Sequence, residues 1–420
     1  MLFNFLKLSN NFNIIHIENK ESEIISISLL GKAGSTFESL PGTAHFLEHV
    51  ALNGTKKYPN KKNLDYVVGK HGGWRGGTTG KEFVEYVVKI IQSEAESGFD
   101  YLSQIAFYPL IEGDVVDKER KIILQEHSRA LSNNQRQLLE TMLNSSFDSK
   151  TMNNMVLGNE SSINKITTND LKNFWNEHYV VNNFVLCVNG NIDKQKAQEL
   201  GEKYFGQLPI KSGEASFPEH KENQMNSVQI LKREDINQAR FMLSYPSPKF
   251  PSKDFYIAQL LTFILGKDPL SKLNQALREK NQLAYDTSAR MLNGYGYSLF
   301  CIETGISENK INDAIKLISK ELKEIGSSTL PAEELAMFKL RYKSNLLFGF
   351  ENSLNVASYH AKHFYISSDL TSYKKELEII EAISTEEIKQ VAKKMFSEKP
   401  HLSVLAKHTK EQDIDIKPLL

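Results

Sequence analysis

The order of strand-like and helical segments in the first half of this 420-residue chain returns in its second half. In the first half, alternating apolar and polar residues predict a pair of strands within 13–30, and buried strands are expected over 83–91 and 182–190. Helical spacing of apolar residues predicts helices from Thr43 and over 63–70, 94–106, 116–133, 171–178 and 194–208. A chain of this length also exceeds the size at which one hydrophobic core keeps growing, so two or more domains are expected.

The two halves are separated by a polar stretch, Pro209–Asn226, which contains prolines and a glycine and lacks apolar periodicity. Such composition is typical of a domain boundary. Strands are then expected near 228–230, 241–245, 299–304 and 402–406, with helices over 255–265 and 270–279 and two further helices. We therefore predict an α+β protein with two similar domains, 1–210 and 227–420, related as a duplication. Each domain is expected to be a mixed, mainly antiparallel sheet with helices packed on one face.

Composition argues against several classes of protein. Lysine plus arginine and aspartate plus glutamate number 51 each, and this zero net charge argues against a nucleic-acid binder. Cys187 and Cys301 lie in apolar runs, so we expect buried free thiols rather than a disulfide or a thiolate metal site. The N-terminus lacks the pattern of a signal peptide, and no apolar stretch is long enough to span a bilayer. A cytoplasmic protein is expected.

His45, Glu48 and His49 form an H-x-x-E-H motif inside the helix that begins at Thr43. Residues four apart share one face of a helix, so both imidazoles can point at one cation. Glu48 lies on the flank of that face, where its carboxylate can reach a water molecule at the metal rather than the metal itself. This order is the mirror of H-E-x-x-H and is typical of the inverzincin metallopeptidases.

A catalytic zinc site needs a third protein ligand and an open position for water. The best candidate for the third ligand is Glu126 on the amphipathic helix 116–133, and Glu119, two turns earlier on the same face, could orient a ligand. The zinc would act as a Lewis acid, and Glu48 would take a proton from water and deliver it to the leaving amine. Imidazole and carboxylate also accept manganese or cobalt, so the choice of metal stays open.

The other histidines are weaker candidates. A motif this short can arise by chance among 11 histidines, so it suggests a metal site without establishing one. His127 would point about 100° away from Glu126 on the helix, and we expect it at the surface. His360 and His363 form an H-x-x-H pair without an acidic partner at ligand spacing, so solvated or packing side chains are expected, not a second site.

The segment that carries the motif, AGSTFESLPGTAHFLEHVALNGTKKYP, resembles the zinc-helix region of the pitrilysin-like metallopeptidases. This is peptidase family M16, which includes the mitochondrial processing peptidase, with its beta-type subunit, and small bacterial homologues. The resemblance covers nearly the whole chain, because HYVVNNFVLCVNGNID and EKYFGQLP are similar to the end of the family's first domain. It implies one Zn²⁺ per chain, with Glu126 as the third ligand and Glu119 as the family's assisting glutamate.

In the second half, LREKNQLAYD resembles the family's arginine–tyrosine segment. The resemblance implies that Arg278 and Tyr285 help to hold or polarise the substrate. Both side chains can donate hydrogen bonds to a peptide carbonyl or to its tetrahedral oxyanion. The alternative is a surface arginine beside a packed tyrosine.

One segment departs from the family pattern. The family often has GG-x-x-N-A-x-T after the zinc helix, and this chain has GGWRGGTT over 72–79, so Gly76 replaces an asparagine that helps to hold the substrate backbone. Trp74 and Arg75 either offer alternative contacts or simply pack. The glycines do not predict a phosphate loop, because the G-K-[ST] ending is absent and a strand follows.

The resemblance implies a zinc-dependent endopeptidase that hydrolyses short or unfolded peptides inside a closed chamber. Larger members of the family build that chamber from four domains, so a two-domain chain implies a homodimer. Two alternatives remain: the catalytic subunit of a heterodimeric peptide-maturation protease, and a non-catalytic peptide-binding or assembly subunit. Neither nucleic acid nor membrane is expected as a partner.

Overall fold

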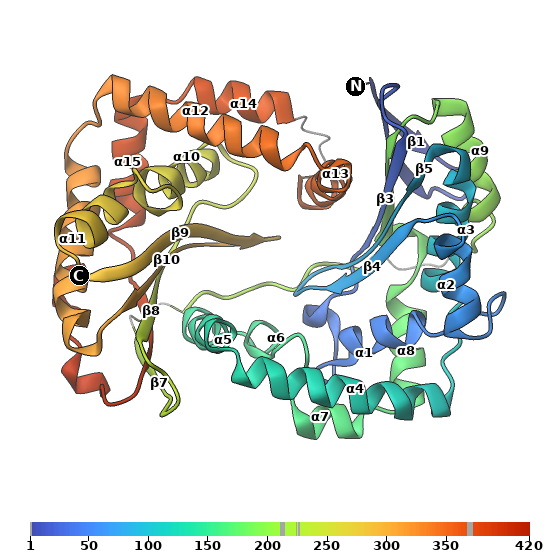
Figure 1. The fold of residues 1–420 in the computed structure, drawn as a ribbon, viewed down its shortest axis with the longest axis horizontal. Coiled ribbons are helices and arrows are strands. Elements are labelled where there is room, and N and C mark those ends of the chain that lie inside the picture. The colour runs from blue at the N-terminus through green and yellow to red at the C-terminus, as the bar shows by residue number, and fades with distance from the viewer. Residues whose placement is uncertain (1, 211–214, 224, 226, 368–372) are drawn as a thin grey trace. The chain divides into compact units, whose positions relative to one another are not determined.

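The computed structural model describes residues 2–210, 215–223, 225, 227–367 and 373–420 and divides the chain into two compact units, each built around one sheet (Figure 1). The first unit contains Met1–Arg129, Asn154–Pro218 and Phe348–Leu370. The second contains Ala130–Asn153, Glu219–Leu347 and Thr371–Leu420. Two segments, 130–153 and 348–370, thus belong to the unit that is formed mainly by the other half of the sequence.

The sheet of the first unit has six strands in the order β1-β2-β6-β3-β5-β4. These strands are β1 (Leu2–Lys7), β2 (Asn13–Glu18), β3 (Ile24–Gly31), β4 (Trp74–Thr79), β5 (Val84–Ile91) and β6 (Phe184–Gly190). β2 and β6 are parallel, and the other neighbouring pairs are antiparallel. The predicted pairing within 13–30 is wrong, because β6 lies between β2 and β3. Alternation identifies a strand and its faces, but it does not identify the neighbour.

Helices cover one face of this sheet with a large apolar core. They are α1 (Thr43–Ala51), α2 (Lys61–Gly69), α3 (Ala95–Phe107), α4 (Gly113–Ser132), α7 (Glu160–Lys165), α8 (Thr168–His178) and α9 (Lys194–Tyr204). Alternate residues of β3, namely Ile25, Ile27 and Leu29, are fully buried in this core. α3 packs on β3 and β5, and α1 packs on α8 and β4. The sheet therefore supports the helix that carries the H-x-x-E-H motif.

The opposite face of the same sheet is covered by α13 (Ser353–Ser367), which lies beside β3 (Figure 1). Its small and branched side chains Val356, Ala357 and Ala361 join a cluster with Ile15 and Cys187. The hydroxyl groups of Ser26 and Ser353 are 2.7 Å apart at the start of this helix. A helix from the second half of the sequence thus completes the first unit, in addition to the helices on the predicted face.

The sheet of the second unit has five strands in the order β7-β11-β8-β10-β9. These are β7 (Ser227–Lys232), β8 (Ala239–Pro246), β9 (Ala284–Gly294), β10 (Tyr297–Ile306) and β11 (His401–Ala406). β7 and β11 are parallel, and the other pairs are antiparallel. Each sheet therefore contains one parallel pair in an otherwise antiparallel arrangement. The predicted class, two mixed and mainly antiparallel α+β units, is confirmed.

The second unit also takes two helices, α5 (Asn134–Ser146) and α6 (Lys150–Asn153), from the first half of the sequence. The other helices of this unit are α10 (Lys253–Thr262), α11 (Ile311–Ser327), α12 (Ala332–Gly349), α14 (Tyr373–Glu381) and α15 (Thr385–Met395), with π-helical segments at Phe263–Lys267 and Asn274–Lys280. Leu138 and Met142 of α5 pack against Met242, Cys301 and Leu405. Cys187 and Cys301 are both buried and free, as predicted.

The predicted domains, 1–210 and 227–420, differ from the compact units by the exchange of α5 and α6 against α13. The boundary within Pro209–Asn226 stays a prediction, and residues 211–214, 224 and 226 lie outside the described part of the chain. In the described part, Phe217 contacts the rings of Phe37 and Phe83 in the first unit.

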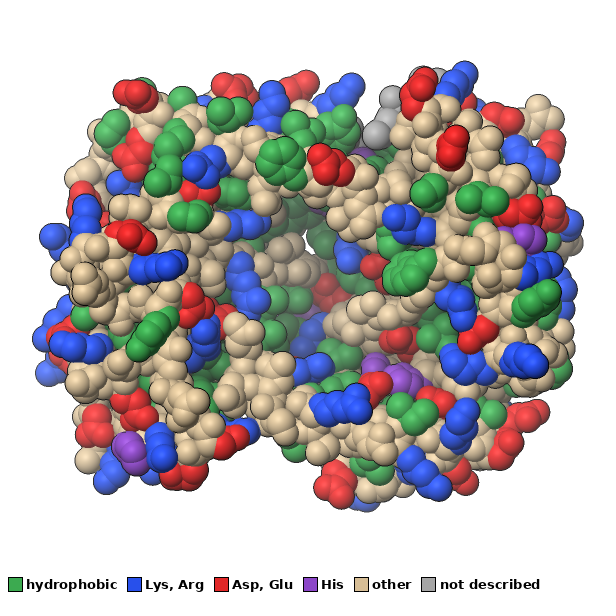
Figure 2. Space-filling view, in the orientation of Figure 1, with side chains coloured by type: hydrophobic (Ala, Val, Ile, Leu, Met, Phe, Trp, Pro, Cys, Tyr) green, Lys and Arg blue, Asp and Glu red, His purple; other side chains and the backbone are tan. Residues whose placement is uncertain are grey.

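The surface charge and the helix hydropathy of the described residues agree with the zero net charge and the short apolar stretches of the sequence. Acidic and basic side chains are interspersed on the face seen in Figure 2, without a large region of one sign among the described residues. In the part of the chain that the structure describes, no helix combines the length and apolar character required to cross a bilayer.

Candidate metal centre

The first turn of α1 is held by two features that precede it. Gly42 has φ 94°, a left-handed conformation that favours glycine. The carboxylate of Glu38 accepts hydrogen bonds from the backbone N–H groups of Gly42 at 2.7 Å and of Ala44 at 2.9 Å. Burial raises the pKa of Glu38 to about 8, while the backbone hydrogen bonds act in the opposite direction. Both oxygens accept N–H groups, which is the hydrogen bonding of the charged carboxylate at a helix N-terminus, the form that is populated above this pKa.

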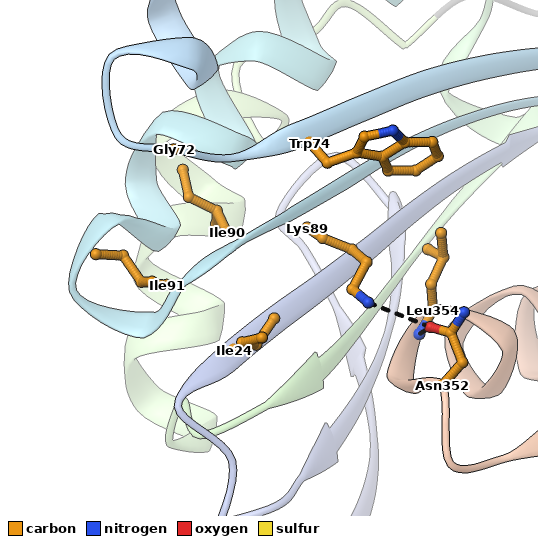
Figure 3. Close-up of a pocket in the computed structure, with 8 residues that line it drawn as sticks. All are labelled: Ile24, Gly72, Trp74, Lys89, Ile90, Ile91, Asn352 and Leu354. Carbon is orange, nitrogen blue, oxygen red and sulfur yellow. Dashed lines mark hydrogen bonds between the residues drawn. The ribbon is translucent and has the colours of Figure 1, made fainter.

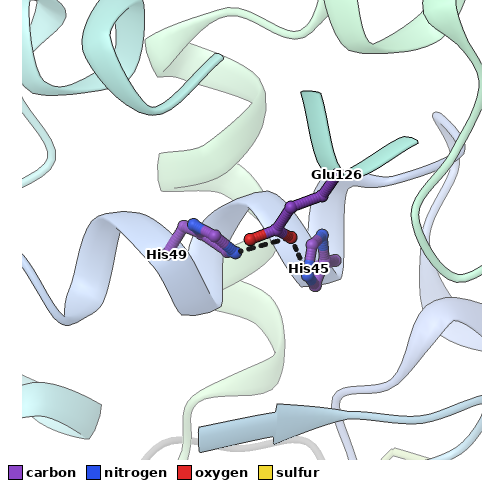
Figure 4. A group of neighbouring side chains, drawn as sticks. All are labelled: His45, His49 and Glu126. Atoms are coloured by element: carbon purple, nitrogen blue, oxygen red, sulfur yellow. Dashed lines mark ion pairs between the residues drawn. The ribbon is translucent and has the colours of Figure 1, made fainter. Parts of the chain in front are cut away.

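His45 and His49, one turn apart on α1, and Glu126 on α4 turn toward one another (Figure 4). Oε2 of Glu126 lies 3.7 Å from Nε2 of His45 and 3.4 Å from Nε2 of His49. The two imidazole centroids are 4.7 Å apart. One ligand atom from each of the three side chains lies within 4.8 Å of the others. Among the described residues, no other group of three His, Cys, Asp or Glu side chains meets at such distances.

This donor set fits a zinc ion. Ligand bonds of about 2.0–2.2 Å in a tetrahedron place neighbouring donor atoms roughly 3.3–3.6 Å apart. The distances of 3.4 and 3.7 Å between the imidazole nitrogens and the carboxylate oxygen are close to that range. Two imidazoles and one carboxylate also leave a fourth position for water or substrate, as catalytic zinc sites do.

Glu119 contacts a candidate ligand from behind. It is buried on α4, and its Oε2 lies 3.0 Å from Nδ1 of His49. Burial acts to raise the pKa of Glu119, but the hydrogen bond and the charge of His49 outweigh it and lower that pKa. A proton on Nδ1 of His49 that is donated to Glu119 leaves Nε2 free for a metal. Asn53 donates to the backbone oxygen of His49 at 2.9 Å and holds the same turn.

The carboxylate of Glu48 contacts β4. It accepts a hydrogen bond from Oγ1 of Thr79, and a Cβ atom on Gly77 would lie 2.8 Å from Oε1 of Glu48. Burial raises the pKa of Glu48, with the charge of Glu126 adding to the effect, while Thr79 and His49 oppose it. The carboxylate is thus fixed beside the three candidate ligands without being one of them.

The glycine-rich segment 72–79 contains β4 and the two residues before it. Its two large side chains, Trp74 and Arg75, differ in how they are packed. The guanidinium of Arg75 contacts Oδ1 of Asp65 at 2.7 and 3.0 Å, so Arg75 is packed against α2. The indole of Trp74 is 55% exposed. It lies over Gly76, where a Cβ atom would come 3.1 Å from Cη2 of the indole. The space for a side chain at position 76 is therefore partly taken by Trp74.

Arg278 and Tyr285 belong to the second unit. Arg278 lies in the π-helical segment Asn274–Lys280, and Tyr285 is the second residue of β9. Nε of Arg278 is 3.7 Å from Oε1 of Glu279, and the Tyr285 side chain is 67% exposed. Neither residue takes part in the His45–His49–Glu126 group. Their exposure disfavours the alternative in which Tyr285 packs in a core.

Of the three histidines set aside above, His127 is buried, and His360 and His363 pack against aromatic rings. The prediction that His127 lies at the surface is wrong, because it is buried on the same stripe of α4 as Val116 and Ile123, at helical spacing. His360 and His363 are a packing pair on α13. The first lies 4.9 Å from the Phe3 ring and the second stacks on Tyr359 at 3.8 Å. Burial lowers the pKa of His360 to about 4 and that of His363 to about 3.

Three residues of the site carry roles that the sequence did not predict: Glu38, Gly77 and Thr79. All three lie inside segments that were singled out, AGSTFES before the zinc helix and GGWRGGTT after it. A glutamate five residues before a helix start is a possible capping signal. The contact between Thr79 and Glu48 joins residues 31 positions apart in the sequence and has no local signal.

Two family models and several relatives match this chain. The family model described as "Insulinase (Peptidase family M16)" matches residues 13–160, and "Peptidase M16 inactive domain" matches residues 165–342. An "Uncharacterized zinc protease" of Rickettsia felis is 27% identical, over 94% of this chain and 95% of that protein. The "Mitochondrial-processing peptidase subunit beta" of Lentinula edodes is 23% identical, over 93% of this chain and 87% of that protein.

A solved structure shares the fold over almost the full length. The crystal structure of a protease from Helicobacter pylori superposes with a TM-score of 0.89 at 21% identity. The match covers 96% of this chain and 99% of that one.

Proposed function

Because this chain belongs to peptidase family M16, we propose that it is a zinc-dependent endopeptidase that hydrolyses short or unfolded peptides. The observation that carries the proposal is the meeting of His45, His49 and Glu126, with the Glu48 carboxylate fixed beside them. Relatives named zinc proteases support the choice of zinc over another divalent metal.

Each residue of the site is proposed to have a separate role in the reaction. His45, His49 and Glu126 would hold the zinc ion, which would supply a Lewis acid that polarises a peptide carbonyl and favours ionisation of water. Glu48 accepts the proton of the attacking water and passes it to the leaving amine. Thr79 and the absence of a side chain at Gly77 keep the Glu48 carboxylate in one orientation. Glu119 keeps the imidazole of His49 in the tautomer that a metal requires.

The preference for unfolded peptides follows from the position of β4. This strand is the last of its sheet and pairs with β5 on one side only, among the described residues. An extended peptide can pair with the free edge through backbone hydrogen bonds. Since Gly77 and Thr79 of β4 contact Glu48, a peptide on this edge passes beside the proposed base. In a folded protein most backbone N–H and C=O groups are already paired within the protein, so far less backbone is available for this pairing.

Arg278 and Tyr285 are proposed to donate hydrogen bonds to the substrate carbonyl or to the oxyanion. Their exposure leaves them available for a substrate. We further propose a homodimer that encloses the peptide in a chamber, and a cytoplasmic location. The second candidate is the catalytic subunit of a heterodimeric processing peptidase, which the likeness to a mitochondrial-processing peptidase subunit beta favours.

A non-catalytic role is disfavoured by the assembled ligand group. The term "inactive domain" applies to the match over 165–342, and the zinc motif lies outside that range. The second half of the sequence contains no copy of H-x-x-E-H.

Cleavage of an unstructured, internally quenched peptide tests the proposal. The wild type supplied with zinc should cleave it, Glu48→Gln should lose at least about 10³-fold in kcat, and the exposed control Glu112→Gln should match the wild type. Equal activity in Glu48→Gln would refute the role of Glu48. If the wild type binds zinc but cleaves nothing, the homodimer proposal gives way to the heterodimer.

A further inference from the structure

A pocket opens on the face of the first sheet that is opposite to Glu48. Its volume is about 400 Å³, and its walls come from β3, β4, β5 and the start of α13 (Figure 3). Successive side chains of a strand point to opposite faces of a sheet. Since Gly77 and Thr79 of β4 face Glu48, Trp74 and Gly76 face the other way, toward this pocket.

The walls of the pocket are mostly apolar. Ile24, Trp74 and Ile91 are 41%, 55% and 50% exposed, and Leu354 of α13 closes the far side (Figure 3). Large apolar side chains that gather around a concave site, half in contact with water, are typical of a binding surface. A ligand with a flat or bulky apolar group would bury this surface.

Among the described residues that line the pocket, Lys89 alone carries a charge. Its Nζ donates to Oδ1 of Asn352 at 3.4 Å (Figure 3), and an ammonium group has three donors in all. Lys89 can therefore donate to an oxygen on the ligand as well. It can also lie over the face of an aromatic ring, which attracts a cation.

The pocket is continuous with the edge on which the substrate is proposed to lie. A peptide paired with β4 sends alternate side chains to the two faces of the sheet. Trp74 is three positions from Gly77, so the peptide residue opposite Trp74 faces the pocket when the residue opposite Gly77 faces Glu48. One extended peptide can thus occupy both sites at once.

Gly76 contributes to the shape of the pocket. A Cβ atom at this position would lie 3.1 Å from the Trp74 indole, so glycine allows the ring to lie along β4 and form one wall. The glycine at residue 76, where the family often has asparagine, and the exposed tryptophan at residue 74 therefore contribute to the same wall of the pocket.

We propose that this pocket is a specificity subsite that takes an aromatic side chain of the substrate, tyrosine before phenylalanine, about three residues from the residue facing Glu48. Trp74, Ile24 and Ile91 contact the ring, and Lys89 donates to the phenolic oxygen. The inference rests on the proposed function, since it assigns a substrate preference to the same edge strand.

Kinetics on a positional series of peptides test the subsite. Each position of one quenched peptide is set in turn to tyrosine, phenylalanine, glutamate or alanine. With the wild type, tyrosine at a single position distant from the cut bond should raise kcat/KM about tenfold over alanine. Trp74→Ala should remove this preference, and Lys89→Met should make tyrosine and phenylalanine equal. The exposed controls Tyr66→Ala and Lys62→Met, on α2, should keep the preference of the wild type.

Tryptophan fluorescence gives a second readout that needs no cleavage. The chain has two tryptophans, and the other, Trp175, donates its indole N–H to the Ala106 oxygen at 2.8 Å. In the Glu48→Gln background, the tyrosine peptide should shift the Trp74 emission to the blue. The alanine peptide should not, and adding Trp74→Phe should remove the shift.

The two proposals fail in different ways. If the wild type cleaves peptides but no aromatic preference depends on Trp74, the subsite is overturned and the peptidase function stands. If the wild type cleaves nothing, the proposal of a self-sufficient homodimeric peptidase is contradicted, and the fluorescence decides the subsite alone. A blue shift specific to the tyrosine peptide then supports the subsite, and its absence overturns it.

Discussion

Replacing Glu38 with alanine removes the acceptor of two backbone hydrogen bonds at the start of α1, from Gly42 and from Ala44. A buried N–H group without an acceptor costs about 1–3 kcal/mol, so the loss of both costs about 2–6 kcal/mol. Entry of water would bring the cost to the lower end of that range. At about 2 kcal/mol, the equilibrium for local opening of this turn rises roughly 30-fold. Glu38→Gln keeps one carbonyl oxygen and should lie between the wild type and alanine.

Hydrogen–deuterium exchange of the α1 amides, followed in the metal-free protein, measures this opening directly. Exchange should quicken most in Glu38→Ala, less in Glu38→Gln, and not in the exposed control Glu23→Ala. Zinc affinity should fall in the same order, because His45 projects from the turn that is loosened. If α1 exchanges equally in all four proteins, Glu38 does not hold the metal helix and the reasoning is refuted.

Three further substitutions have definite expected outcomes. Glu119→Gln removes the charge that orients the His49 imidazole, so zinc affinity in a chelator competition should fall about 10–100-fold; an unchanged affinity would contradict this role. Thr79→Val removes the hydrogen bond to Glu48, so kcat should fall about tenfold while zinc content stays at one per chain; loss of zinc instead would show a structural role. Burial lowers the pKa of His360 from 6.5 to about 4, so protonation favours the unfolded chain. The free energy of unfolding is therefore unaffected above pH 6.5 and falls by up to about 3 kcal/mol as the pH drops toward 4. His360→Phe should therefore flatten the fall in unfolding free energy between pH 7 and 4.5, measured with urea, and an unaltered fall would exclude His360 as its source.

Local patterns predicted most of the fold. The helix over 94–106 and the buried strand over 83–91 agree with α3 and β5 to within a residue or two. Strand neighbours and helix partners were not predictable in the same way, because periodicity records which residues are buried and not what covers them. The insertion of β6 between β2 and β3 is one example. The exchange of α5 and α6 against α13 between the compact units is another.

The candidate metal site was predictable where its residues share a helix. His45, Glu48 and His49 have fixed positions on one turn, so their spacing alone indicates their chemistry. Glu126 lies on a different helix, α4, so helical spacing alone does not relate it to the motif. The distances in the structure place it beside both histidines. The contact of Thr79 with Glu48 depends on where β4 lies against α1, which the sequence pattern does not record. His127 was misjudged because the buried stripe of α4 includes it four residues after Ile123.

Diffraction from crystals grown with zinc, collected on both sides of the zinc absorption edge, tests the central claim most directly. The account predicts one anomalous peak per chain within bonding distance of Nε2 of His45, Nε2 of His49 and a carboxylate oxygen of Glu126. The peak should be absent from His49→Ala crystals. A zinc ion bound elsewhere in the chain, or no ion at these three side chains at saturating zinc, would contradict the proposed metal centre and the peptidase chemistry that depends on it.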